Sequence, residues 1–340
     1  MKSFMKSFLI LALLPLVLLT SCKDDDPLVQ ESEFDILTEY MAQQQLDLSD
    51  VLSGWVTAGT GLNVDPTDFS VPGYYVIDIR SSADFNTGHI KDAHNTSIAN
   101  ILDEAVNAGS DPILVVCYTG QTAGRATAAL RLMGYNAKSL KWGMSGWHSD
   151  FNAKWVANAT DYDSPNWLRT GAPVPDGTFD APTLLTGKTT GAEILEARVR
   201  AALNNSSWGL PKTEVLSNPN NYFVMNKWPQ DSWDTYGYVN GAYRIDELLN
   251  LENLNKINPN QTAVLYCYTG QTSATTNMWL EVLGYDMRSL LFGANGIVHS
   301  ELVVGTIGGG KKKSWHGEGS GSQLNFGYYD ADGNLHNPVF

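Results

Sequence analysis

Short apolar runs alternate with longer stretches of helical periodicity along most of the chain. Ile113 to Val116 and Ala263 to Tyr266 are compact apolar runs of the kind that forms buried strands. Each run is followed, after a short loop, by a helix-like stretch, Ala123 to Met133 or Ser273 to Leu283, and a glycine comes directly after that stretch. Strands that alternate with helices predict an α/β protein whose sheets are mainly parallel and flanked by helices.

The same pattern extends upstream of both runs. Tyr75 to Ile79 and Tyr222 to Met225 are strand-like, and Gly191 to Leu203 has the pattern of an opening helix, with Phe34 to Leu46 as its counterpart. The elements therefore occur in two similar sets.

An identical hexapeptide occurs once in each set. Cys117-Tyr118-Thr119-Gly120-Gln121-Thr122 returns 150 residues later as Cys267-Tyr268-Thr269-Gly270-Gln271-Thr272. The register then holds, because Gly134, Gly143 and Gly146 match Gly284, Gly293 and Gly296. A period of this length indicates a duplicated domain and not a solenoid.

The length of 340 residues fits two domains. We expect a first domain over residues 31–150, a connector over 151–187 and a second domain over 188–305. Residues 306–340 form a Gly-rich and aromatic tail, and its segment Phe326 to Tyr329 should add a strand or cover the second domain.

The N-terminus has the pattern of an export signal. Residues 1–21 carry Lys2 and Lys6 before an apolar run that is too short to span a membrane comfortably, and Cys22 ends a sequence similar to a bacterial lipoprotein box. Residues 22–30 form an acidic tether that resembles the surface-export signal of Bacteroidetes lipoproteins. We expect a lipid anchor at Cys22 in the outer membrane of the cell envelope, with the domains exposed at the surface. A secretory signal with a chance cysteine, and a merely solvated tether, are the alternatives.

Charge and cysteine content exclude several functions. Acidic residues outnumber basic ones 36 to 22, which disfavours a nucleic-acid partner, since phosphate neutralisation needs clustered Lys and Arg. Three cysteines cannot build a disulfide scaffold, and neither CxxC nor HExxH occurs, so no metal is predicted.

The hexapeptide places a cysteine between a buried strand and a helix. Backbone N–H groups of the loop and the helix N-terminus should face the sulfur and favour a thiolate, which predicts a lowered cysteine pKa. Gly120 and Gly270 permit the sharp turn, and Thr122 and Thr272 can add hydroxyl donors.

These residues resemble the rhodanese family of sulfurtransferases over residues 60–150 and 205–300. The resemblance in the first copy comprises Val76-Ile77-Asp78-Ile79-Arg80, Asp84-Phe85, Gly88-His89-Ile90, the Cys117 loop and Gly143-Met144-Ser145-Gly146-Trp147. It implies two rhodanese-like domains in which Cys117 and Cys267 carry sulfane sulfur as a persulfide.

The resemblance also implies the remaining site residues. The loops Tyr118–Thr122 and Tyr268–Thr272 would bind substrate, and Asp78, Arg80 and His89 would support the fold. The partners would be a small sulfur-containing anion as donor, such as thiosulfate or mercaptopyruvate, and a thiophilic acceptor. No cofactor is implied, and the oligomeric state stays open.

The residues of the two cysteine loops also bear on other functions. A cysteine phosphatase needs Arg six positions after the cysteine, where Ala123 and Ser273 stand. Neither loop contains Lys or Arg, which disfavours thiosulfate as the natural donor. A non-catalytic binding module and a thiol-based redox or sulfide sensor stay open as alternatives.

The two copies differ in their supporting residues. Asp78 and Arg80 become Asn226 and Trp228 in the second copy, and His89 becomes Tyr238. Because rigidly placed donors lower barriers for anion transfer, the sequence predicts that Cys117 carries most of the activity.

Membrane anchoring through Cys22 gives a direct test. Cys22→Ser removes the acylated thiol, so the variant should move from the membrane fraction to the soluble fraction, because stable anchoring requires the acyl chains. Fractionation after a high-salt wash measures this, and sedimentation of the variant with the membranes would exclude the lipid anchor.

Overall fold

The computed structural model describes residues 31–245, 249–317 and 322–338. The expected signal peptide, Cys22 and the acidic tether lie outside these residues. Within them, no helix has both the length and the apolar character required to cross a membrane.

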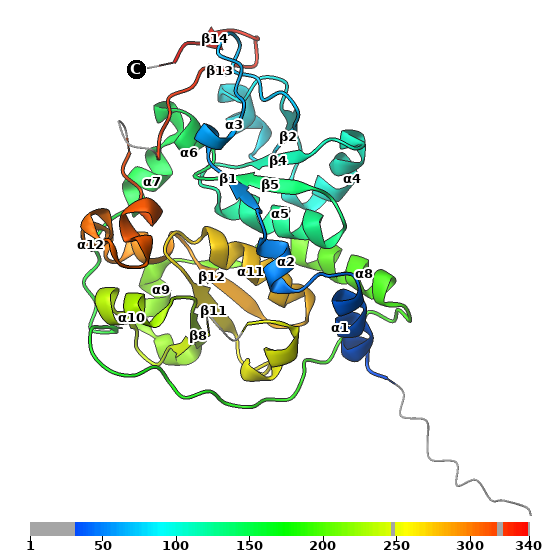
Figure 1. The fold of residues 1–340 in the computed structure, drawn as a ribbon, viewed down its shortest axis with the longest axis vertical. Helices are drawn as coiled ribbons and strands as arrows, with labels where there is room; N and C mark the ends of the chain where they lie inside the picture. The colour runs from blue at the N-terminus through cyan, green and yellow to red at the C-terminus, as the bar shows by residue number, and fades with distance from the viewer. Residues whose placement is uncertain (1–30, 246–248, 318–321, 339–340) are drawn as a thin grey trace, which may run out of the picture. The chain divides into compact units, whose positions relative to one another are not determined.

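The first repeat forms a parallel five-stranded sheet (Figure 1). Its strands are β1 (Val56–Thr57), β2 (Tyr75–Asp78), β3 (His94–Asn95), β4 (Ile113–Val116) and β5 (Ala137–Leu140). Their order is β1-β5-β4-β2-β3, so β4 lies at the centre. Cys117 follows this central strand directly.

The second repeat builds an equivalent sheet. Its strands are β7 (Gly209–Leu210), β8 (Phe223–Asn226), β10 (Tyr243–Arg244), β11 (Ala263–Tyr266) and β12 (Met287–Leu290). The order is β10-β8-β11-β12-β7, and all pairs are again parallel. Read from β7, it is the same strand order as in the first sheet, with β11 at the centre. The predicted α/β class with two mainly parallel sheets is therefore confirmed.

The helices flank both sheets. They are α1 (Glu33–Gln43), α2 (Leu48–Leu52), α3 (Ser82–Thr87), α4 (Ile101–Ala105), α5 (Gln121–Leu132), α6 (Met144–Trp147), α7 (Ala153–Asn158), α8 (Gly191–Leu203), α9 (Lys212–Ser217), α10 (Gln230–Tyr236), α11 (Gln271–Val282) and α12 (His299–Val304). Helices α5 and α11 begin two residues earlier than the sequence pattern predicted. Gly120 and Gly270 adopt left-handed backbone angles and start each helix inside the hexapeptide.

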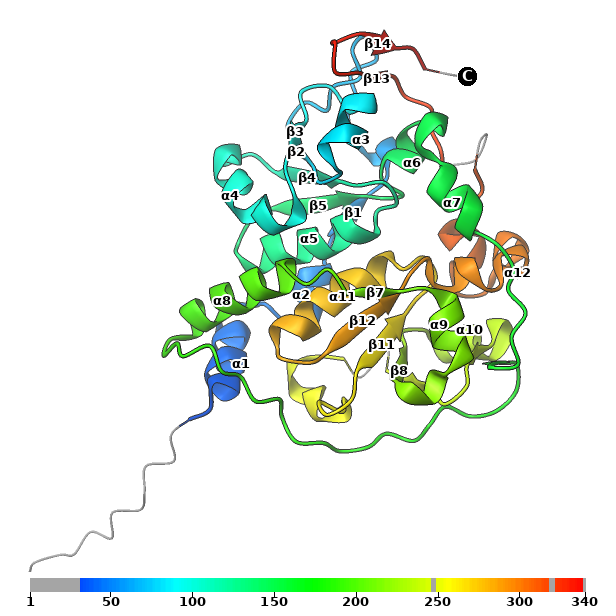
Figure 2. The ribbon, with the colours of Figure 1, turned by 180° about the vertical axis from the view of Figure 1, so that it is seen from behind.

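A layer of helices lies between the two sheets. Figures 1 and 2 show α5 and α11 stacked there, with α1 and α8 at one end. Alternate strand residues point into this shared core: Ile77 and Val115 from the first sheet, Met225 and Leu265 from the second. One apolar core therefore joins the two repeats.

Buried polar contacts cross the same layer. Arg125 of α5 is fully buried and forms an ion pair with Glu281 of α11 at 2.8 Å. It also donates to Asn277 Oδ1 and to the Ala202 carbonyl. Because an unpaired buried charge is costly, these contacts favour one particular packing of the two repeats.

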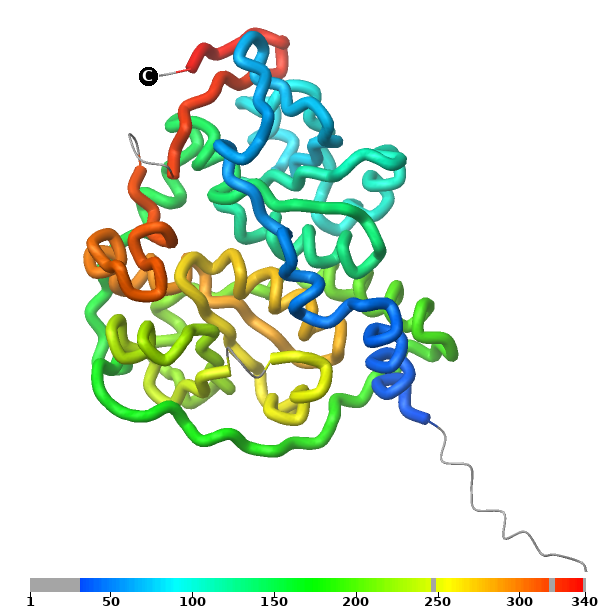
Figure 3. The backbone as a smooth tube through the Cα atoms, viewed as in Figure 1, coloured from blue at the N-terminus to red at the C-terminus, as the bar shows by residue number. Residues whose placement is uncertain are grey.

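The start of the C-terminal tail packs on the second repeat, where Asn295 Nδ2 donates to Lys313 O at 2.9 Å, whereas its segment 326–329 covers the first repeat. Of the two expectations for this segment, a strand is confirmed over Tyr328–Tyr329, and cover of the second repeat is wrong. The strands β13 (Tyr328–Tyr329) and β14 (Leu335–His336) of the tail form an antiparallel hairpin, as Figure 3 shows beside the first repeat. His89 and Tyr329 exchange backbone hydrogen bonds at 2.9 Å, and Trp147 Nε1 donates to Gly327 O at 2.8 Å. Trp147 offers a large buried ring that the second repeat lacks, since Ile297 stands in its place.

The strands β6 (Trp167–Leu168) and β9 (Tyr238–Val239) form a separate antiparallel pair.

Candidate active site

Cys117 lies at the end of β4, where its sulfur faces the start of α5. The thiol is 5% exposed and accepts hydrogen bonds from the Gly120 N–H at 3.2 Å and the Ala123 N–H at 3.3 Å. The left-handed angle at Gly120 turns these N–H groups toward the sulfur. The loop is therefore a cradle for a sulfur anion.

Burial opposes this cradle. Removal from water raises the pKa of the Cys117 thiol above its ordinary value, and the Asp78 carboxylate adds to the rise, whereas the backbone N–H groups lower it only in part. The predicted lowering of the pKa is thus wrong for Cys117, because the sequence pattern gives the donors of the loop but not the depth of burial.

Cys267 has a different partner. The thiol is 4% exposed and lies 3.7 Å from the Ser273 Oγ, which is itself 2.7 Å from the Ser289 Oγ. Ala123 occupies the matching place beside Cys117 and has no hydroxyl. A hydroxyl can accept from a thiol or donate to a thiolate, so Ser273 can follow a change of charge on Cys267.

A second segment of each repeat holds the backbone of its cysteine loop. In the first repeat, Met144 N–H donates to Cys117 O at 2.8 Å, and Gly143 lies so close that an added Cβ would be 2.2 Å from the same oxygen. In the second repeat, Gly293 has the same close approach to Cys267 O, and Ala294 N–H donates to that oxygen at 3.0 Å. The matched glycines signalled this contact in the sequence, where they served only to define the repeat.

Asp78 and Arg80 form a buried ion pair at the end of β2. Arg80 Nη2 lies 2.6 Å from Asp78 Oδ2 and donates to Gly88 O at 2.6 Å, so the pair ties the strand to the next turn. His89 stacks on Phe85 with ring centroids 3.9 Å apart and does not line the cavity at Cys117.

The cavity at Cys117 contains charges of both signs. Its volume is about 390 Å³, and Thr119, Gln121 and Thr122 line it. Arg80 and Lys154 bring positive charge, and Asp84 brings negative charge. Hydrogen bonds from Ser81 and Tyr118 hold the pKa of Asp84 below its ordinary value, so it is ionised at neutral pH.

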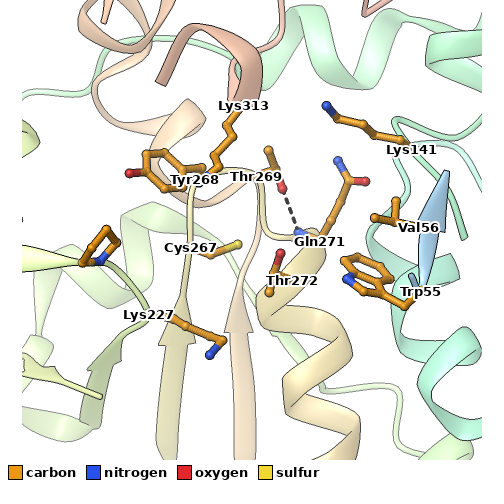
Figure 4. A pocket seen from close by; sticks show the side chains of 11 residues that line it. Trp55, Val56, Lys141, Lys227, Cys267, Tyr268, Thr269, Gln271, Thr272 and Lys313 are labelled. Atoms are coloured by element: carbon orange, nitrogen blue, oxygen red, sulfur yellow. Dashed lines mark hydrogen bonds between the residues drawn. The ribbon is translucent and has the colours of Figure 1, made fainter. Parts of the chain in front are cut away.

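The cavity at Cys267 is more positive (Figure 4). Its volume is about 260 Å³, and Thr269, Gln271 and Thr272 line it. Lys141, Lys227 and Lys313 come from three separate segments, and none of the described residues that line the cavity is Asp or Glu. Burial lowers the pKa of Lys141, and the nearby charge of Lys313 adds to this effect. An anion in this cavity would relieve their repulsion.

Each cavity is completed by the other repeat. Trp208, Leu291 and Phe292 of the second repeat line the cavity at Cys117, whereas Trp55, Val56 and Lys141 of the first line that at Cys267. The lysines were missed by sequence reasoning because the hexapeptide itself carries no cation. The absence of cations that the sequence showed is a property of the two loops, whereas both cavities around them contain cations.

The difference in charge has a local cause. Tyr118 donates to the Asp84 carboxylate at 2.7 Å, whereas Tyr268 donates to the Ser232 hydroxyl at 2.6 Å. Asp84 lines the first cavity, and no carboxylate is among the described residues that line the second. The change from Asp78 and Arg80 to Asn226 and Trp228 removes one charge of each sign. Among the described residues no group of His, Cys, Asp and Glu could hold a metal ion.

Each site thus places a cysteine between the end of a central parallel strand and a helix N-terminus. In an α/β protein this arrangement favours negative charge on the cysteine sulfur or on a group bound to it.

Comparisons with known proteins agree with this class. A model of the rhodanese-like domain matches residues 66–150. Thiosulfate sulfurtransferase GlpE of Shewanella oneidensis is 37% identical over 75 residues, which is 22% of this chain and 74% of the relative. GlpE of Pseudomonas fluorescens is 33% identical over 84 residues, 24% of this chain and 77% of the relative. The chain therefore belongs to the rhodanese family, and its named relatives support a sulfurtransferase activity.

A solved structure of a 3-mercaptopyruvate sulfotransferase, SseA of Escherichia coli, is 15% identical. The match covers 72% of this chain and 98% of SseA, with a TM-score of 0.25.

The raised pKa of Cys117 predicts its alkylation behaviour. The rate of reaction with iodoacetamide, read on the Cys117 peptide by mass spectrometry, should rise with pH and reach its midpoint above the ~8.5 of a free cysteine. Only the thiolate reacts, and burial delays its formation. A midpoint below that value would mean that the N–H cradle outweighs burial.

Proposed function

We propose that this protein is a sulfurtransferase that takes sulfane sulfur from a small anionic donor, such as thiosulfate or mercaptopyruvate, and passes it to a thiophilic acceptor. The observation that carries the proposal is the cavity at Cys267, where a buried thiol faces three lysines and none of the described lining residues is a carboxylate. A cavity of this charge favours an anion beside a nucleophile.

The reaction with thiosulfate has two steps. The cysteine first loses its proton to solvent, and the thiolate attacks the outer sulfur of thiosulfate. A new S–S bond forms, the S–S bond of the donor breaks, and sulfite leaves with the electron pair, so that the cysteine becomes a persulfide anion. In the second step a nucleophilic acceptor such as cyanide attacks the outer sulfur, leaves as thiocyanate and restores the thiolate.

The lysines give the donor its place. Lys313 Nζ lies 4.4 Å from the centroid of the Tyr268 ring, and Lys141 Nζ donates to Lys312 O at 3.2 Å, so both ammonium groups are held near the loop. Charge-assisted hydrogen bonds from these groups would bind the leaving sulfite more strongly than neutral loop donors.

The charges also argue for a division of work between the cysteines. Asp84 and Asp78 offset Arg80 and Lys154 at the first site, and burial raises the pKa of the Cys117 thiol. We therefore propose that Cys267 is the main acceptor of sulfur from an anionic donor, in place of the prediction from sequence that favoured Cys117.

Lipid anchoring belongs to the same proposal. Acylation at Cys22 would attach the protein to the outer membrane, and the acidic tether would hold both domains in the surrounding aqueous space. The sulfur donor and acceptor would then be met outside the cytoplasm.

Intact mass spectrometry tests the sulfur transfer. Incubation with thiosulfate should add the mass of one sulfur per reactive cysteine, and a reductant should remove it. Cys267→Ser should abolish most thiocyanate formation, whereas Cys117→Ser should leave a substantial part, because the more positive cavity remains. If neither cysteine gains sulfur from either donor, the binding-module alternative is favoured; if Cys117→Ser is the more damaging change, the sequence-based assignment holds.

Donor recognition by Lys141 gives a second prediction. Lys141→Gln should raise the KM for thiosulfate about tenfold with a smaller change in kcat, because it removes one charged contact. In the unmodified protein, KM should rise with pH already below 10.5, since the pKa of Lys141 is lowered from that value and only its charged form binds the anion. Steady-state kinetics measure both effects. Lys188→Gln, at an exposed position outside both cavities, is the matched control; an equal rise in its KM would overturn the assignment.

A further inference from the structure

The glutamine of each cysteine loop forms a hydrogen bond with the other repeat. Gln121 is 2% exposed, and its Oε1 accepts from the Phe292 N–H at 2.7 Å while its amide donates to Thr119 Oγ1 at 3.1 Å. Gln271 makes the mirrored contact with the Trp142 N–H at 3.4 Å, and its amide nitrogen has no hydrogen-bond partner among the described residues. The link from Gln121 is therefore the better formed of the two.

The backbone held by Gln121 has an unfavourable conformation. Phe292 has a φ of +61°, in the left-handed region that aromatic residues rarely adopt. It directly precedes Gly293, the residue that lies against the carbonyl of Cys267. Trp142, at the matched position of the first repeat, has a φ of +68°, so both repeats use this conformation before their supporting segment. In each repeat the N–H of this residue donates to a glutamine of the opposite loop, and the bond is shorter at Phe292.

The residues that form this hydrogen bond also lie beside Cys117. Gln121 and Phe292 both line the cavity at Cys117. Within the second repeat, segment 293–295 holds the Cys267 loop through the Ala294 N–H and through the Asn295 N–H, which donates to Tyr268 O at 3.0 Å. A short path of direct contacts therefore leads from the first cavity to the second cysteine.

We infer that Gln121 is a positioning residue for Cys267, the cysteine of the opposite repeat, and couples the two sites. Its acceptor oxygen holds Phe292 in the left-handed conformation, and Phe292 in turn fixes the segment that orients the Cys267 loop. The inference rests on the proposed function in treating Cys267 as a working nucleophile. Gln121 belongs to the first repeat, yet on this inference it affects the reactivity of a thiol in the second.

The test reads Cys267 in a Cys117→Ser background, so that no effect passes through the chemistry of Cys117. Gln121→Met keeps the length of the side chain and removes the acceptor. It should lower the rate of Cys267 alkylation about fivefold, the value expected for one hydrogen bond. Gln121→Glu keeps an acceptor oxygen, to which Thr119 can donate, and should restore the rate to within about twofold. Peptide mass spectrometry follows Cys267 alone.

A second substitution separates positioning from a general loss of stability. In Phe292→Gly, the glycine adopts a positive φ without strain and does not need the hydrogen bond from Gln121 to hold it there. Gln121→Met added to this variant should therefore change the rate of Cys267 alkylation by less than about twofold. The mirrored variant, Gln271→Met read at Cys117 in a Cys267→Ser background, should have a smaller effect than Gln121→Met because its hydrogen bond is longer. An unchanged Cys267 rate in Gln121→Met, a failure of Glu to restore it, or an equal loss with Gly at position 292 would each overturn the inference.

Failure of the proposed function is distinguishable from failure of the coupling. Alkylation reports the position of the thiol without any sulfur donor. If Cys117→Ser gains no sulfur from thiosulfate or mercaptopyruvate while alkylation follows the expected pattern, the coupling stands and the assignment of Cys267 as a sulfur acceptor fails. If sulfur is gained and alkylation is indifferent to Gln121, the reverse conclusion applies.

Discussion

The close crossing of α5 and α11 determines the geometry of both sites. Gly124 permits it, because a Cβ at this position would lie 2.8 Å from Thr275 Oγ1 and 3.1 Å from Gln271 O. Both helices begin at the cysteine loops, so their contact brings the two loops together. Each repeat then supplies a wall of the other cavity, and neither site would be complete in an isolated domain.

The elements near the repeat could be predicted because local signals defined them. The runs that became β4 and β11 are short, apolar and bounded by turn residues, and their limits were predicted correctly. The starts of α5 and α11 were missed by two residues, because glycine in a left-handed conformation can begin a helix inside what the sequence presents as a loop. The contact of segment 326–329 with the first repeat was missed, since nothing in its own pattern identifies Trp147 as the ring that it covers.

The candidate site was predicted only in part, for a physical reason. A hexapeptide defines the cysteines and the donors beside them, but the charge of a cavity depends on residues that only the tertiary structure brings together. Lys141, Lys227 and Lys313 come from different parts of the chain and have no common motif. Burial, which raises the pKa of Cys117, is likewise a property of the packed fold. Periodicity indicates that a strand is buried but not how far water reaches along the loop that follows.

The differences between the copies can be understood as a change of charge without a loss of packing. Where the first repeat has the buried Asp78–Arg80 pair, the second has Asn226 and Trp228, and the Trp228 ring stacks on Tyr268 with centroids 4.9 Å apart. Replacing a buried ion pair by uncharged side chains removes the cost of taking two charges out of water, although Asn226 is still a fully buried polar side chain. Although Asn226 and Trp228 depart from the first repeat, the Trp228 ring still supports the Cys267 loop through Tyr268. The loss of the ion pair leaves the net charge unchanged, whereas Lys141, Lys227 and Lys313 come from elsewhere in the chain. Among the described lining residues, the second cavity is therefore the more positive one without any cation inside its hexapeptide.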